Sequence, residues 1–340
     1  MKIFELTLKP LSGFGTPLKG DTIFGHICWQ AFYDDSLFGK TISELIADYD
    51  KDPFIVVSSA FFKVSEKEET YRIFKRPDLP ISKLFIFKDK ETKDIIANRK
   101  VLKSQKWLLL RDSEKILNLK GSKYISESDL YNIIQANFSN KNLKGTSIFK
   151  SITQPHNTIN RLTNTTGEGR FAPFSSEQIV FNENVMLIIY AGIREDIRSE
   201  QLETAFQRIG DAGFGRDAST GLGKFRILSV QEIDLFKLGS PTPNACYSLS
   251  PCVPQNDSFI EFYFNPFTKF GRHGDVLAKS TNPFKNPVLM ADEGAVFIPR
   301  DIKEILKKPY IGKALKGVSK VMKDSVAQGY SLYIPVSMEA

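Results

Sequence analysis

The pattern of apolar and polar residues at the start of the chain predicts a strand. Within Ile3–Leu8 an apolar side chain recurs at every second position, which is the pattern of a strand with one buried face. The same reasoning, applied along the chain, predicts strands at Phe54–Val64, at Gln178–Ala191 with a break at 182–184, and at Lys224–Val230.

Apolar residues at helical spacing predict a helix that begins at Gly20 or Asp21 and ends near Tyr33. Its buried stripe consists of Ile23, Phe24, Ile27, Cys28 and Ala31. His26 lies off this stripe, so we expect it, together with Trp29 and Tyr33, on or near the opposite side. Further helices are predicted at Ile42–Tyr49, Ile197–Ile209 and Ile302–Lys308.

The order of these elements in the first part of the chain is β-α-β … β-α-β, which indicates a ferredoxin-like or RRM-type fold. Between the two halves, residues 65–150 are predicted as an insertion, with strands near Leu84 and Leu108 and a helix near Asp129–Asn137. The segment 239–243, Gly-Ser-Pro-Thr-Pro, is the most linker-like part of the sequence and marks the predicted domain boundary. Beyond it, strands near Ser248, at Phe259–Phe264 and at Tyr330–Val336 indicate a smaller α+β unit.

Composition places this chain among globular proteins. Its 340 residues are 41% hydrophobic, and the longest apolar run is far shorter than a membrane-spanning helix requires. The first ten residues lack the apolar core of a signal peptide, and the three cysteines do not suit a disulfide framework. We therefore expect a reduced, cytoplasmic protein that does not bind a membrane.

Positive charge is gathered in three segments, although the net charge is only +7. Basic residues outnumber acidic ones by eight to two in 99–123, by five to one in 141–170 and by seven to one in 303–323. A single basic segment is often a solvated helix face. Three segments interleaved with Trp107, Tyr124, Phe149 and Phe171 favour contact with a nucleic acid.

A glycine-rich segment, Gly210–Phe225, admits three interpretations. Its spacing partly matches a dinucleotide fingerprint, but it follows a predicted helix and precedes a strand, which is the reverse of the required order. It also fails the Walker A pattern, because Phe225 stands where a serine or threonine would bind magnesium. A glycine-rich hairpin that serves only the fold is the second interpretation. The third is a loop that lies against an RNA backbone, with its amides and its cations facing the phosphates.

Four separate motifs resemble a known family. KPLSGFGTPLKGDTIFGHICW near the N-terminus, HNTINR at His156–Arg161, GFGRDASTGLGKF at Gly213–Phe225 and YSLSPCVP at Tyr247–Pro254 are similar to RAMP-superfamily subunit four, the Cas-five-type subunit, of type III-A CRISPR (Csm) complexes. The resemblance implies an α+β fold of two ferredoxin-like (RRM-type) RAMP domains, residues 1–238 and 239–340. The first would contain a long insertion (about 65–175) and a β-hairpin thumb. It matches poorly over 99–150 and 257–323.

The resemblance also implies a non-catalytic role in antiviral defence. Such subunits grip the 5′ handle of the crRNA, cap the filament of backbone RAMP subunits and dock the large Cas-ten-type signalling subunit, so that target RNA is met only indirectly. Asn157 and Arg161 would touch RNA, Ile159 would wedge between bases, and Lys19 would meet the handle. The full set of predicted RNA-binding residues is Lys19, Gly20, His156, Asn157, Ile159, Arg161, Arg170, Gly213, Gly215, Arg216, Ser219, Thr220, Gly221, Gly223 and Lys224.

Two other functions stay open at the level of sequence. One is a metal-independent endoribonuclease that processes crRNA, with His26 as the general base for a 2′-hydroxyl. The other is a protein scaffold without RNA contact. Arg161 has a structural alternative as well, namely an ion pair with Glu168. The sequence holds no spacing typical of a metal site, and we expect no metal and no cofactor.

Overall fold

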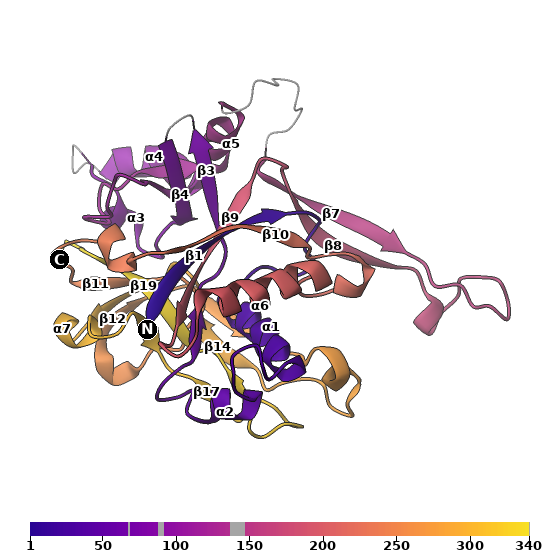
Figure 1. The fold of residues 1–340 in the computed structure, drawn as a ribbon. Helices are drawn as coiled ribbons and strands as arrows, with labels where there is room; N and C mark the ends of the chain where they lie inside the picture. Colours follow the sequence, from indigo (N-terminus) through magenta and orange to yellow (C-terminus); the bar gives the residue numbers. More distant parts are fainter. Residues whose placement is uncertain (67–68, 88–91, 137–146, 340) are drawn as a thin grey trace.

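The computed structural model describes residues 1–66, 69–87, 92–136 and 147–339 (Figure 1). Its largest element, the N-terminal sheet, has eight antiparallel strands in the order β10-β1-β9-β3-β4-β5-β6, with β2 paired to β9. These strands are β1 (Lys2–Pro10), β2 (Ile55–Val57), β3 (Phe61–Glu66), β4 (Glu69–Lys75), β5 (Gln105–Arg111), β6 (Tyr124–Ser126), β9 (Met186–Ile193) and β10 (Phe225–Glu232).

Two helices pack against each other on this sheet, α1 (Gly20–Tyr33) and α6 (Ser199–Ala212). The predicted β-α-β … β-α-β order is present, as β1-α1-β2-β3 and β9-α6-β10. The predicted stripe of α1 is buried, with Cys28 the least buried member. The shorter α2 (Ile42–Ala47) begins at the predicted residue, where Thr41 and Glu44 form a reciprocal capping box.

The insertion does not form a separate unit, since β4, β5 and β6 extend the N-terminal sheet at one edge. Its helices are α3 (Ile81–Leu84), α4 (Thr92–Ser104) and α5 (Glu127–Ala136); Asn137, the predicted end of α5, lies outside the described residues. The strand predicted near Leu84 is wrong. This segment is the short helix α3, which starts after Pro80 and buries Leu84, and a short apolar run does not distinguish the two structures.

The single strand predicted at Phe54–Val64 is also wrong, because β2 and β3 are separated at 58–60. Three successive amides here donate to three different segments of the chain. Ser58 donates to the carbonyl of Tyr190, Ser59 to that of Leu249, and Ala60 to that of Leu18. The chain therefore changes partners at this point, and no ladder continues through it.

A second antiparallel sheet, the C-terminal sheet, has the strand order β12-β15-β11-β19-β16. Between residues 239 and 339, all of which are described, the one α-helix is the four-residue α7 (Ile302–Ile305). A ferredoxin-like unit has two helices, so this part of the chain shows less of that pattern than the first part. Its strands are β11 (Ala245–Ser248), β12 (Phe259–Tyr263), β13 (Pro266–Lys269), β14 (Val288–Ala291), β15 (Val296–Pro299), β16 (Tyr310–Gly312), β17 (Leu315–Lys316), β18 (Val326–Ala327) and β19 (Tyr330–Val336).

The two sheets share one hydrophobic core, to which Tyr190 contributes from the N-terminal sheet and Ile334 from the C-terminal sheet. Polar contacts also join the sheets. The Gln328 side chain accepts from the amide of Val57 (2.9 Å) and donates to its carbonyl (2.7 Å). Among the helices of the described residues, none has both the length and the apolar character needed to span a membrane.

A two-stranded ribbon projects from the body of the molecule (Figure 1). It consists of β7 (Phe149–His156) and β8 (Phe174–Phe181), paired in register from Phe149 opposite Phe181 to His156 opposite Phe174. We call residues 149–181 the thumb and residues 157–173 its tip. The HNTINR motif therefore begins at the end of the ribbon and runs into the tip.

Candidate RNA-binding site

The thumb presents its predicted RNA-binding residues to solvent. His156 ends the ribbon, where its ring stacks on Phe174 (centroids 5.1 Å apart) and its Nε2 lies 2.9 Å from Ser176 Oγ. Beyond it, Asn157, Ile159 and Arg161 are exposed, and Ile159 is 59% exposed. An apolar side chain at this exposure is free to contact a ligand.

Arg161 does not form the predicted alternative ion pair with Glu168, nor an ion pair with any other residue in the described ranges. Its guanidinium therefore keeps its donors for a ligand. The side chain of Arg170 lies outside the described part of the structure.

The glycine-rich loop has a backbone that other residues would strain. Gly213, Gly215, Gly221 and Gly223 all have positive φ, from 73° to 100°. Gly223 is the most restricted, because a Cβ there would stand 2.1 Å from the carbonyl oxygen of Phe214. The amide of Phe214 donates to Gly223 O (3.0 Å), which closes the neck of the loop. The predicted residues exposed on this loop are Arg216, Ser219, Thr220 and Lys224.

Side-chain contacts fix this loop between the first turn of the chain and the thumb. The amide of Arg216 donates to Thr16 Oγ1 and the amide of Lys224 donates to Ser12 Oγ, both at 2.9 Å. The Arg216 guanidinium donates to the carbonyl of Glu177 on β8 (2.5 Å). The structure thus ties the glycine-rich loop to β8 of the thumb.

His26 lies off the buried stripe of α1, beneath this loop. Its ring packs on Phe214 (4.6 Å between centroids), and its Nε2 accepts a hydrogen bond from the amide of Gly215 (3.1 Å). Burial, with a smaller contribution from the Lys269 charge, lowers the pKa of His26 to about 4. The ring is neutral at pH 7, and its accepting nitrogen is already occupied by the protein.

Lys19 and Gly20 lie where α1 meets the C-terminal half of the chain. The Lys19 ammonium contacts Asp292 Oδ1 (2.5 Å) and both carboxylate oxygens of Glu293 (2.8 and 2.9 Å). Burial alone would lower the pKa of Lys19, but these two carboxylates raise it, so the side chain stays charged. Gly20 is buried, and a Cβ there would stand 2.4 Å from the carbonyl of Val57. An RNA phosphate at Lys19 would have to compete with both carboxylates.

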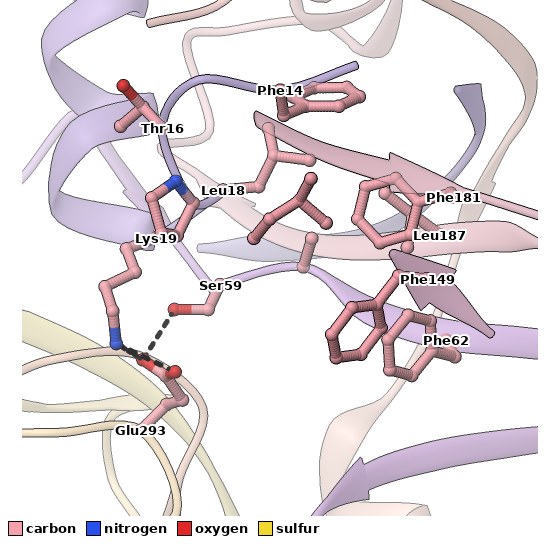
Figure 2. A pocket seen from close by; sticks show the side chains of 13 residues that line it. Phe14, Thr16, Leu18, Lys19, Ser59, Phe62, Phe149, Phe181, Leu187 and Glu293 are labelled. Carbon is pink, nitrogen blue, oxygen red and sulfur yellow. Dashed lines mark hydrogen bonds and ion pairs between the residues drawn. The ribbon is translucent and has the colours of Figure 1, made fainter. Parts of the chain in front are cut away.

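A cleft at the base of the thumb escaped the sequence reasoning. It consists of two neighbouring cavities, of about 160 Å³ and about 560 Å³, which share Ala60, Phe62 and Glu293. Figure 2 shows the smaller cavity, with phenylalanine rings at one end and Lys19, Ser59 and Glu293 at the other. The apolar residues around this smaller cavity include Phe14, Leu18, Phe62, Phe149, Ile179, Phe181 and Leu187.

The larger cavity has a more basic lining, with Lys75, Arg76 and Lys106 next to Trp107. Lys106 is exposed and forms no ion pair within the described ranges. Trp107 and Phe149, two of the four aromatic residues singled out in the basic segments, line this cleft. Tyr124 does not, because it is buried and its hydroxyl donates to Leu119 O (2.6 Å).

The three cysteines, Cys28, Cys246 and Cys252, are free thiols. In the part of the chain that the structure describes, no group of three or more histidine, cysteine, aspartate or glutamate residues is arranged to hold a metal ion.

No protein-family model matches the sequence, and no curated protein matches it either. Solved structures do match over the whole chain. A chain in the crystal structure of a Csm1-Csm4 cassette in complex with cA4 has a TM-score of 0.58 at 15% identity, with all of both chains covered. The same cassette in complex with pppApA gives a TM-score of 0.57 at 15% identity, covering 100% of this chain and 98% of that one.

A chain of a Csm3-Csm4 subcomplex from the type III-A CRISPR-Cas interference complex matches as well, with a TM-score of 0.53 at 17% identity. It covers 98% of this chain and 99% of that chain. The chain is thus a mixed α/β protein with large antiparallel sheets, and it shares its fold with a chain of each of these complexes. Csm4 is the component named in all of them.

Proposed function

We propose that this protein is a non-catalytic RNA-binding subunit of a type III-A CRISPR effector complex, and that it grips the 5′ handle of the crRNA. In this role it caps the filament of backbone RAMP subunits and docks the large Cas-ten-type subunit. Residues 1–238 and 239–340 are its two RAMP domains. The likeness in fold to chains of the Csm1-Csm4 and Csm3-Csm4 complexes supports the proposal.

The observation that carries the proposal is the exposed tip of the thumb. Ile159 and Leu162 are 59% and 94% exposed, beside the guanidinium of Arg161, which has no ion-pair partner within the described ranges. Recognition of single-stranded RNA needs surfaces against which bases stack and cations that bind phosphates. Arginine suits the second role because its fork donates two bonds to one phosphate.

The glycine-rich loop extends this surface towards the body of the protein. Arg216 joins the loop to β8 of the thumb, and Lys224 lies exposed at the other end of the loop. Ser219 and Thr220 add exposed hydroxyls between them. An RNA strand that leaves the thumb tip along the loop therefore meets further groups that donate hydrogen bonds to its phosphates.

The test is the affinity of the purified full chain for single-stranded RNA, measured by fluorescence anisotropy. Arg161→Ala and Arg216→Ala should each weaken binding by about 1–3 kcal/mol, since each removes a charge-assisted bond. Arg300→Ala is the matched control, because Arg300 is an exposed arginine next to α7, which lies away from the thumb in Figure 1. Wild-type affinity in both folded thumb and loop variants would refute the assignment of these residues.

Salt dependence separates RNA binding from a pure protein scaffold. The logarithm of the affinity should fall with the logarithm of salt concentration, with a slope of about −0.7 for each neutralised phosphate. A flat response would favour the scaffold. RNA cleavage is tested with precursor RNA in EDTA, and specific cleavage that His26→Ala abolishes would favour the ribonuclease instead.

A further inference from the structure

The two faces of the thumb ribbon differ in what they contact. Residues directly opposite each other in a ribbon share a face, and side chains alternate between the faces along each strand. One face holds Phe149 and Phe181, which line the smaller cavity of the cleft. The other face, which we call the outer face, runs from Lys150 near the base of the thumb to His156 and Phe174, which lie opposite each other at the end of the ribbon. The outer face is therefore directed away from the cleft.

Along the two described strands, the outer face carries a lysine and no acidic residue. Its members are Lys150, Ile152, Gln154, His156, Phe174, Ser176, Gln178 and Val180. Lys150 is exposed and forms no ion pair with any residue of the described ranges. Glu177 is the only acidic residue in the sequence of the two strands, and it lies on the opposite face, where it pairs with Thr153. These charges favour an RNA strand over an apolar protein surface as the ligand of the outer face.

Phe174 presents an aromatic ring at the far end of the outer face. Its side chain is 56% exposed, and its ring lies nearly parallel to that of His156, at an angle of 13° and with the centroids 5.1 Å apart. His156 is held in turn by Ser176, whose Oγ lies 2.9 Å from its Nε2. The ring of Phe174 is thus already fixed in place, so that little side-chain entropy is lost when a second ring stacks on it.

We propose that Phe174 is a stacking platform for one unpaired base, and that the thumb therefore takes single-stranded RNA irrespective of its sequence. Bases in a duplex stack on one another, whereas a base of a single strand can turn out onto an aromatic side chain. Every base has such a ring face, so stacking selects single strands without selecting a sequence. Lys150 lies towards the base of the thumb and Arg161 within its tip, so each is placed to bind a phosphate of the same strand. The inference rests on the proposed RNA-binding function and names the class of RNA that the thumb binds.

The test compares two fluorescein-labelled decamers, one of uridine and one of abasic ribonucleotides, which keep the phosphates but lack every base. The wild-type full chain should bind the uridine decamer more tightly. Phe174→Leu, which is apolar but not aromatic, should weaken binding of the uridine decamer about tenfold and leave that of the abasic decamer unchanged. Phe174→Tyr should keep wild-type affinity for both, because its ring still stacks. Phe270→Leu is the matched control and should also bind as the wild type does, since Phe270 is 76% exposed but lies outside the thumb.

Unchanged affinity of folded Phe174→Leu for the uridine decamer would overturn the inference and leave the ring for a protein partner. An equal loss with the abasic decamer, or with a blunt RNA duplex, would also overturn it, because neither presents an unpaired base. If Arg161→Ala weakens both decamers while Phe174→Leu weakens neither, the platform fails and the RNA-binding function stands. If the wild-type chain binds none of these RNAs, both proposals fall.

Discussion

The neutral imidazole of His26 predicts an acid-sensitive step in the stability of the protein. Histidine in an unfolded chain has a pKa of about 6.5, whereas that of His26 in the folded protein is about 4. Below pH 6.5 the unfolded chain therefore takes up a proton at His26 before the folded protein does. The contribution of the neutral ring to the free energy of unfolding is complete above pH 6.5 and is lost as the pH falls to about 4.

The size of the effect follows from the pKa of His26, which differs by about 2.5 units between the unfolded chain and the folded protein. At 1.36 kcal/mol per unit, the free energy of unfolding should fall by about 3 kcal/mol through His26 alone. Carboxylates with lowered pKa, such as Asp196, also lose stabilising charge in acid. A matched variant is thus needed to isolate the histidine.

His26→Gln supplies that control, because a glutamine oxygen replaces Nε2 as acceptor for the Gly215 amide and does not titrate. Urea unfolding of both proteins, followed by circular dichroism at pH 7, 6, 5 and 4, gives the free energy of unfolding at each pH. The wild-type protein should lose about 3 kcal/mol more than His26→Gln between pH 7 and pH 4. Parallel curves for the two proteins would refute the assignment of a buried neutral ring.

Three further predictions concern single residues. Gly223→Ala should lower the free energy of unfolding by at least about 2 kcal/mol in urea unfolding, because φ is 73° and the new Cβ would meet Phe214 O; a neutral effect would contradict the loop geometry. Glu5→Gln should lower the free energy of unfolding by about 3–5 kcal/mol in the same assay, since the buried Glu5 carboxylate contacts both Lys63 and Arg72. A loss below about 1 kcal/mol would show that these cations find other partners. Ile159→Ala should leave the melting temperature unchanged but weaken RNA binding by about 1–3 kcal/mol, and unchanged affinity would remove the wedge from the thumb.

Local pattern was sufficient for the elements that build the first half of the fold. The alternation at Ile3–Leu8 correctly predicted a strand and the stripe correctly predicted α1. The expectation that β1 buries only one face is wrong, because all of Ile3–Leu8 is buried and the polar Glu5 is held there by Lys63 and Arg72. The pattern failed where an apolar run was too short to carry a period, as at Leu84. It also failed at 58–60, where three long-range hydrogen bonds interrupt an apolar stretch.

The tertiary structure alone decided how the predicted residues meet. His26 lies off the apolar stripe of its own helix, yet the glycine-rich loop, 189 residues further along, covers it. In the sequence Lys19 has no evident partner, but in the structure Asp292 and Glu293 of the C-terminal half form ion pairs with it. The cleft at the base of the thumb is built from phenylalanines on separate elements, and of these the sequence singled out Phe149 but not Phe14, Phe62 or Phe181. Periodicity reports only which face of an element avoids water, whereas a pocket depends on which distant faces come together, and that is fixed by packing in three dimensions.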